Sequence, residues 1–333
     1  MANGIMGKVS LPQPMSITLF IPSLSGLHTH TATHRRYPAL ETLFARSKAQ
    51  PAADSNAELA KLFGLPTGFG AAPFMRLADT GERDTGFYFC ADPVHLAPDR
   101  DQLVMLPLSV LQVQMGEAQA LAETFNRNYA NEGYRLETPH PERWYLRVPA
   151  PLKCVTHEPI VVAGRSVFEF MPEGEAGQRL RQLMNEIQML FYEQPVNLAR
   201  EAAGRPSINS LWMWGGGRLL ETPITVPDTV LTNMPLVAGL ALCASSDYTA
   251  WTGILDKRLE SEEQLIAIDC TTDSELMRIE EQLAVPLLRE LRMGHIDSLV
   301  IYPGNQRCYH VSQASLRKFW RRRRALADIL RTT

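Results

Sequence analysis

The stretch EQPVNLAREAAGRPSINSLWMWGGG, residues 193–217, is the most informative segment of the chain. It joins a polar, arginine-bearing loop to a short run with two tryptophans, and it ends in three consecutive glycines. The run NSLWMWGG is typical of a strand, with Trp212 and Trp214 packed one on each face and a glycine turn behind them. A second interpretation makes the glycines a phosphate cradle of exposed backbone amides, with Arg205 and Arg218 as anion contacts. No lysine and serine or threonine follow in a P-loop arrangement, so a nucleotide site is not expected.

Strands and helices are predicted to alternate on both sides of this stretch. On its N-terminal side, the apolar pattern predicts a strand at 16–22 and helices at 38–49 and 56–64. On its C-terminal side, the pattern predicts, in order, a helix at 234–247, a strand at 263–270, a helix at 273–294 interrupted by Pro286, strands at 297–304 and 307–312, and a last helix at 313–331. This order fits an α/β fold with an open, mostly parallel sheet and helices on both faces.

Residues 80–165 follow a different pattern. The predicted elements in this segment are strands at 87–96, 101–108, 143–148 and 158–164, with a helix at 116–133. Such an order is typical of a small α+β subdomain. An amphipathic helix at 176–195 then leads back to the core. We therefore expect a flexible leader at 1–14, an α/β core at 15–79 and 166–333, and an inserted α+β subdomain at 80–165.

The composition is that of an ordinary globular protein, with 45% hydrophobic and 21% charged residues in a chain of 333. The net charge of −3 is unevenly distributed. The basic segment RKFWRRRR at 317–324 has six positive charges, so the rest of the chain has a net charge of −9. On a helix these arginines spread around the cylinder and stay solvated or pair with the acidic surface. Nucleic acid is therefore not an expected partner. The alternative is an interaction module whose basic end docks on an acidic partner or nucleic acid.

The cysteines and the apolar runs bear on cellular location. The five cysteines are scattered, odd in number and form no CxxC pair, which argues against a disulfide framework or a structural zinc site. The N-terminal residues lack the long apolar run of a signal peptide. No window approaches the ~18–20 apolar residues that a membrane span needs. We therefore expect a cytoplasmic protein with no membrane partner.

The stretch 193–217 resembles a segment of the cofactor-independent phosphoglycerate mutases, particularly their archaeal-type branch. That family places a Pro-x-Asn, an Arg, a glycine-containing loop and an Asn before a Trp-x-Trp-Gly-x-Gly run. The matching residues in this sequence are Pro195, Asn197, Arg200, Gly204, Asn209, Trp212, Trp214, Gly215 and Gly217. Over residues 16–320 the whole pattern is most similar to a group of bacterial proteins called "regulatory protein, RpfE type".

The resemblance implies an alkaline-phosphatase-like fold. It also implies, for the parent family, phosphate transfer through a seryl phosphoenzyme with two divalent metals held by Asp and His ligands. Two metals need several carboxylates and imidazoles to offset their charge and fix their geometry. This sequence departs from the family at three ligand positions. After the first strand, the family's Asp is replaced by Pro22, Ser23 and Ser25. The family's Asp-x-x-x-His pair is represented by Asp269 and Asp273 without a histidine. After the last strand, Asn305 and His310 stand in place of an Asp-His pair.

These departures predict that the two-metal site is absent. We expect no catalytic residue and no cofactor, and a pseudoenzyme with a regulatory or binding role. The alternative is an active, metal-dependent phosphoglycerate mutase or phosphohydrolase with a rearranged site, drawn from His28, His30, Asp92 and His95.

A histidine cluster follows the first predicted strand. His28, His30 and His34 lie in GLHTHTATHRRY, and a His-x-His at a strand end can converge on one ion, here Mn or Zn. The other interpretation is a solvent-exposed Thr/His loop, since no later Asp or His cluster completes the site. We expect the loop.

A second polar cluster, CADPVHLAPDRD, contains Asp92, His95 and Arg100. Asp92 could orient His95 as a base. The structural interpretation is a turn started by Asp-Pro, with the following charges on a hairpin. If the chain keeps a site for a small anionic ligand or a protein partner, the candidate residues are Asp92, His95, Arg100, Arg205, Asn209, Trp212, Trp214, Gly215, Gly216 and Gly217.

Overall fold

The computed structural model describes residues 15–30, 35–220, 227–254 and 262–331. The chain divides into two compact units, the first made of Met1–Gly68 and Ile224–Thr333 and the second of Phe69–Pro223. The second unit therefore begins before, and ends well after, the inserted segment expected at 80–165. The leader expected at 1–14 lies outside the described residues.

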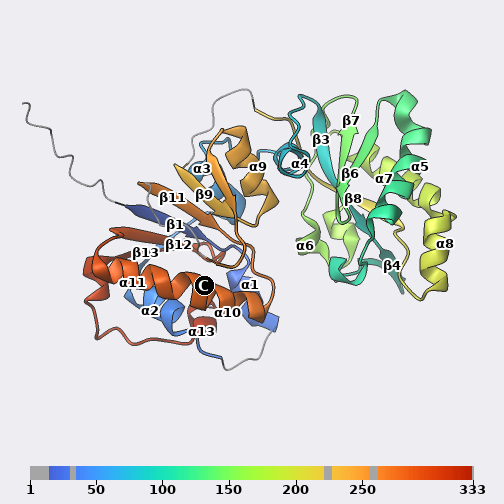
Figure 1. The fold of residues 1–333 in the computed structure, drawn as a ribbon. Helices are drawn as coiled ribbons and strands as arrows, with labels where there is room; N and C mark the ends of the chain where they lie inside the picture. Colours follow the sequence, from blue (N-terminus) through green and yellow to red (C-terminus); the bar gives the residue numbers. More distant parts are fainter. Residues whose placement is uncertain (1–14, 31–34, 221–226, 255–261, 332–333) are drawn as a thin grey trace, which may run out of the picture. The chain divides into compact units, whose positions relative to one another are not determined.

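The first unit is built on a seven-stranded sheet with the order β10-β9-β11-β1-β12-β13-β2 (Figure 1). Its strands are β1 (Ser16–Phe20), β2 (Lys48–Pro51), β9 (Thr229–Thr232), β10 (Asp247–Ala250), β11 (Glu263–Ala267), β12 (Ser298–Tyr302) and β13 (Arg307–Ser312). The five strands from β10 to β12 are parallel, and β13 is antiparallel to both of its neighbours. The mostly parallel α/β sheet predicted from the sequence is confirmed.

Helices cover both faces of this sheet, with α2, α11 and α13 on one side and α3 and α9 on the other (Figure 1). The helices of the first unit are α1 (Leu24–His30), α2 (Pro38–Arg46), α3 (Ser55–Leu62), α9 (Pro235–Cys243), α10 (Asp273–Ile279), α11 (Val285–Met293), α12 (Gln313–Leu316) and α13 (Leu326–Leu330). A π-helical segment, Glu280–Ala284, joins α10 to α11, whose first turn contains Pro286. Pro286 therefore interrupts the helix without ending it, because a first turn has no use for the missing N–H.

Several elements of the chain differ from the predictions, and strands β9 and β10 were not predicted. The helix expected at 38–49 ends at Arg46, and the residues after it form the edge strand β2. The strand expected at 158–164 is a short helix, α6 (Pro159–Val162). The single helix expected at 313–331 is broken, because residues 317–325 between α12 and α13 are irregular.

The second unit is built on a four-stranded antiparallel sheet with the order β6-β7-β3-β8. Its strands are β3 (Phe87–Val94), β6 (Arg135–His140), β7 (Arg143–Val148) and β8 (Ser210–Gly217), and β4 (Leu96–Asp99) with β5 (Gln102–Met105) forms a separate hairpin. The long helices are α4 (Ala72–Thr80), α5 (Met115–Tyr129), α7 (Gly177–Tyr192) and α8 (Pro195–Ala202). The 3₁₀ turns are η1 (Leu108–Val110), η2 (Ala130–Glu132) and η3 (Val167–Phe170).

The core of the second unit lies between its sheet and the amphipathic helices. The apolar stripe of α7, which includes Leu180 and Ile187, is fully buried there with Trp144, Leu211 and Trp212. Helix α7, assigned to the α/β core by its place in the sequence, belongs to the second unit instead. Among the described residues, no helix combines the length and apolar character needed to cross a membrane.

Candidate functional site

The two tryptophans of β8 both contribute to the core of the second unit. Trp212 is buried and donates from Nε1 to the carbonyl of His157 at 2.7 Å. Trp214 is partly buried, packs on the same core, and donates from Nε1 to Oδ2 of Asp92 at 2.7 Å. The prediction that they occupy opposite faces is wrong, because side chains two residues apart on a strand share a face.

Asp92 lies on strand β3, beside β8, and its carboxylate is buried in the interior of the second unit. Its exposed fraction is 7%, and burial raises the pKa of Asp92 to about 7. The hydrogen bond from Trp214 and the charge of Arg143 work in the opposite direction, while Glu158 and Asp79 raise the pKa further. Asp92 therefore changes its charge near neutral pH inside the second unit.

Asp79 organises the polar groups of strand β7. Arg143 donates to its two carboxylate oxygens at 2.9 and 2.7 Å, and the hydroxyl of Tyr145 donates to Oδ2 at 2.6 Å. Burial raises the pKa of Tyr145 well above its ordinary value, so this phenol stays protonated. Asp79 thus has three close donors, and the helix that carries it is fixed to the sheet.

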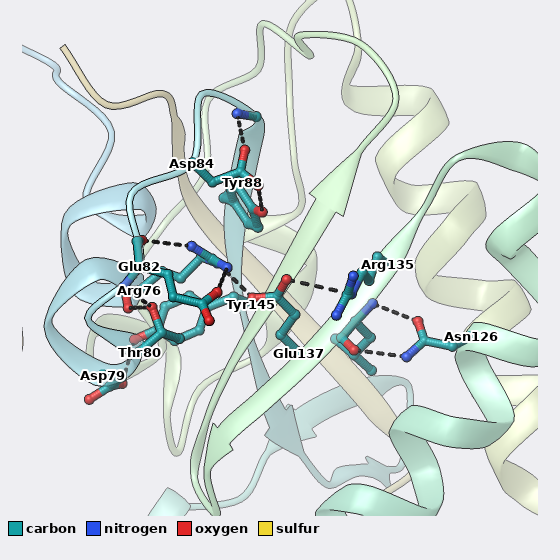
Figure 2. Close-up of polar contacts among 12 residues, drawn as sticks. Arg76, Asp79, Thr80, Glu82, Asp84, Tyr88, Asn126, Arg135, Glu137 and Tyr145 are labelled. Atoms are coloured by element: carbon teal, nitrogen blue, oxygen red, sulfur yellow. Dashed lines mark hydrogen bonds and ion pairs between the residues drawn. The ribbon is translucent and has the colours of Figure 1, made fainter. Parts of the chain in front are cut away.

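Arg76 is the centre of a second network on the same helix, shown in Figure 2. Its Nε donates to Glu137 at 2.6 Å, its Nη1 donates to the carbonyl of Glu82 at 3.1 Å, and its guanidinium lies 4.7 Å from the centre of the Tyr88 ring. Tyr88 in turn donates to Asp84 at 3.0 Å. This network was not predicted from the sequence. Its signal was a lone arginine in the apolar run PFMRLA, since a buried guanidinium requires a carboxylate partner.

The proposed pairing of Asp92 with His95 does not form. Nδ1 of His95 lies 2.8 Å from the carbonyl of Ser207, whereas Asp92 binds Trp214. Asn209 makes two hydrogen bonds to the backbone of Leu96, at 2.8 and 2.9 Å, and so joins β4 to the loop before β8. These contacts support the structural interpretation of the cluster.

Arg100 and Arg205 also have structural positions. Arg100 lies at the tip of the β4–β5 hairpin with a φ of 55°. Arg205 donates to Glu117 at 2.8 Å, and Glu117 also accepts from the fully buried Arg200 at 2.6 Å. Burial would raise the pKa of Glu117, but the Gln114 amide and the two guanidinium groups outweigh it and lower that pKa.

The glycines of β8 allow close packing. A Cβ on Gly216 would lie 2.4 Å from the ring of Phe89, and one on Gly217 would lie 2.8 Å from Cα of Gly70. Both distances are far below van der Waals contact, so a side chain at either position would displace its neighbours. Gly215 has a φ of 63°, which also favours glycine. This geometry supports a packing role over a phosphate cradle.

The carboxyl edge of the parallel sheet in the first unit is the second candidate region, because ligands of open α/β sheets bind there. Ser23, after β1, accepts a hydrogen bond from the amide of Cys270 at 2.8 Å. Asn233, after β9, accepts from the Asp269 amide at 2.7 Å and donates to the Asp269 carbonyl at 3.0 Å. Asn305, after β12, donates to the hydroxyl of Tyr309 at 3.0 Å. Ser23 and Asn233 thus tie neighbouring loops to one another, and Asn305 ties its loop to strand β13.

Among the described residues, the donor set at this edge does not fit two divalent metals. Of the described residues that directly follow the parallel strands, the free carboxylates are Asp269 and Asp273, since Glu275 accepts from the amides of Thr271 and Thr272. Burial, with the charges of Glu275 and Asp269, raises the pKa of the Cys270 thiol to about 12, which disfavours a thiolate ligand.

The histidines do not complete that set among the described side chains. His310 pairs with Val300 in the interior of the β12–β13 ladder, away from the carboxyl end of β12. His28 and His30 lie on α1, which replaces the loop expected there, but their side chains and all of His34 lie outside the described residues. Within the described part of the chain, no three His, Cys, Asp or Glu side chains gather in a metal-binding arrangement.

The sequence relatives of the chain are phosphoglycerate mutases. No protein-family model matches the chain. A probable 2,3-bisphosphoglycerate-independent phosphoglycerate mutase from Geobacter sulfurreducens is 28% identical over 200 residues, which covers 55% of this chain and 47% of that protein. A 2,3-bisphosphoglycerate-independent phosphoglycerate mutase from Methanosarcina barkeri is 27% identical over 154 residues, which covers 43% of this chain and 39% of that protein. The matches thus span less than half the length of either relative.

A solved structure supports the fold. The PH0037 protein from Pyrococcus horikoshii superposes with a TM-score of 0.52 at 12% identity, over 91% of this chain and 88% of that one. The chain is therefore distantly similar to cofactor-independent phosphoglycerate mutases, with a mixed α/β fold around a mostly parallel sheet. The resemblance predicted from residues 193–217 is confirmed at that level.

Proposed function

We propose that the chain is a phosphoglycerate-mutase-like protein that no longer transfers phosphate and serves a regulatory or binding role, as its resemblance to the group called "regulatory protein, RpfE type" implies. The observation that carries this proposal is the donor set at the carboxyl edge of the parallel sheet. Two-metal phosphotransfer needs several carboxylates and imidazoles around its ions. The described residues after the parallel strands supply Asp269 and Asp273, together with the hydroxyl of Ser23 and the amides of Asn233 and Asn305.

The hydrogen bonds at this edge support a structural use of the remaining polar groups. The amide of Asn233 and the hydroxyl of Ser23 bind neighbouring loops of the first unit, and the amide of Asn305 binds Tyr309 of strand β13. A Cβ on Gly304 would lie 1.9 Å from the carbonyl of Pro22, so the loops after β12 and β1 are in direct contact. The described part of this edge thus uses its polar groups in structural contacts and offers fewer carboxylates and imidazoles than two metals require.

The first test is the metal content of the untagged protein, by elemental mass spectrometry after purification with manganese and zinc supplied. We expect less than one stoichiometric ion per chain and no interconversion of 2- and 3-phosphoglycerate above a no-enzyme control. One or two tightly held ions, with metal-dependent turnover of a phosphate ester, would contradict the proposal. Variants of His28, His30, Asp92 and His95 would then locate the rearranged site.

A further inference from the structure

The basic segment 317–324 forms neither a helix nor a strand, and hydrogen bonds near its centre fix its path. Nη2 of Arg46 donates to the carbonyl of Phe319 at 2.9 Å, and Nη1 of Arg321 donates to the carbonyl of Ser47 at 2.6 Å. After the segment, Leu326 and Leu330 of α13 are buried in the core of the first unit. The arginines therefore do not spread around a helix. They lie on an irregular segment that is hydrogen-bonded to Arg46, the last residue of α2, and to Ser47.

This path brings arginines together around one cavity of about 410 Å³. Arg321, Arg322 and Arg324 come from the basic segment, and Arg307 comes from β13. The cavity also has an apolar wall that includes Phe44 and Tyr309, whose rings meet edge to face with centroids 4.8 Å apart. A volume of this size is in the range of small-molecule sites, which typically occupy ~300–1,000 Å³.

In the described part of the chain, the arginines around this cavity have no carboxylate partner. No carboxylate is among the residues that line it, and the ion pairs of the described residues include none to its four arginines. The nearby carboxylate of Glu41 is bound to Arg36 at 2.7 Å. Guanidinium groups cannot relieve their mutual repulsion by losing a proton near neutral pH. A bound anion would offset that repulsion.

We propose that this cavity binds a small organic phosphate with an apolar or aromatic body. Planar guanidinium groups donate paired hydrogen bonds to phosphate oxygens, and the wall formed by Phe44 and Tyr309 accommodates the apolar part. The four charges favour a dianion over a single carboxylate. This site uses none of the residues at the carboxyl edge of the sheet, so it stands whether or not the chain is an enzyme.

The test is calorimetric titration of the full chain with phenyl phosphate, inorganic phosphate and phenol, in about 0.1 M salt, where distant exposed charges are screened. We expect saturable binding of one phenyl phosphate per chain, tighter than inorganic phosphate, and no measurable binding of phenol. Arg322→Ala and Arg324→Ala should each weaken phenyl phosphate binding about tenfold or more, because each removes a charge-assisted hydrogen bond.

Arg323→Ala is the matched control, because Arg323 lies between those two residues and does not line the cavity. It removes the same charge from the same segment and should change the dissociation constant less than about twofold. Far-ultraviolet circular dichroism would verify that each variant is folded. The proposal is overturned if phenyl phosphate shows no saturable binding. It is equally overturned if Arg323→Ala weakens binding as much as Arg324→Ala, since diffuse charge would then explain the affinity.

Discussion

Two sets of arginines, one in each unit of this protein, have opposite surroundings. In the second unit, Arg76, Arg143 and Arg200 are buried or half-buried, and each binds a carboxylate at 2.6–2.9 Å. In the first unit, Arg322 and Arg324 are exposed beside a cavity, with no carboxylate partner among the described residues. A buried guanidinium needs a carboxylate partner to offset its charge, whereas an exposed guanidinium is hydrated and remains available to bind an anion. The first set therefore holds a fold, and the second can hold a ligand.

Arg200 gives the largest expected effect. Its side chain is fully buried, and it donates to Glu117 at 2.6 Å, to the carbonyl of Pro206 at 2.7 Å and to the carbonyl of Leu111. Arg200→Met should lower the free energy of unfolding by about 3–5 kcal/mol, because it leaves the carbonyls of Pro206 and Leu111 without this donor and removes the buried one of the two guanidinium partners of Glu117. Urea denaturation followed by tryptophan fluorescence measures this loss.

The control for Arg200 is Arg205→Ala. Arg205 binds the same carboxylate at 2.8 Å, but 40% of its side chain is exposed. Its removal should cost less than about 1 kcal/mol, because water already screens the pair. Equal losses for the two variants would show that burial does not set the importance of an arginine in this unit.

Asp92 provides the next effect, which depends on pH. Its pKa in the folded protein is raised to about 7, against an ordinary value of 3.8. The folded state therefore holds the proton while the unfolded state loses it, so the wild-type protein loses stability as the pH rises from about 4 to 7. Asp92→Asn removes this loss, and its advantage over the wild type should grow to the order of 4 kcal/mol by pH 8.

Denaturation midpoints of both proteins between pH 5 and pH 8 would measure that difference. Trp214→Phe sharpens the test, because it removes the hydrogen bond that lowers the pKa of Asp92 and should move the transition to higher pH. A stability difference between Asp92→Asn and the wild type that stays constant with pH would show that Asp92 is not the titrating group.

The sequence predicted the elements of both units better than it predicted their contacts. Strand β8 and the parallel strands β1, β11 and β12 were accessible because their apolar runs and boundary residues are local signals, whereas the short strands β9 and β10 were not predicted. The pair of Arg200 with Glu117 joins residues 83 positions apart, so no local pattern reveals it. The bounds of the second unit were missed for a similar reason, since the place of α7 depends on long-range packing against β8.

The basic segment shows how tertiary contacts override local preference. Arginine favours helices, so residues 317–324 were expected to continue one. The hydrogen bonds from Arg46 to Phe319 and from Arg321 to Ser47 replace helical bonds with contacts to α2 and the residue that follows it. The shape of the candidate anion site follows from this break, and a continuous helix would have dispersed its arginines.

The smallest expected effect concerns the arginines of that cavity. Arg324 is exposed and has no carboxylate partner in the described part of the chain, so Arg324→Ala should change the free energy of unfolding by less than about 0.5 kcal/mol. Removing one of four like charges relieves repulsion, so the change should be neutral or slightly stabilising at low salt and should disappear at high salt. Urea denaturation of the wild type and the variant at both salt concentrations measures it. A loss comparable to that of Arg200→Met would mean that Arg324 stabilises the fold. The unpaired arginines of the cavity would then not differ from the paired ones, and the argument that they are available to a ligand would fail.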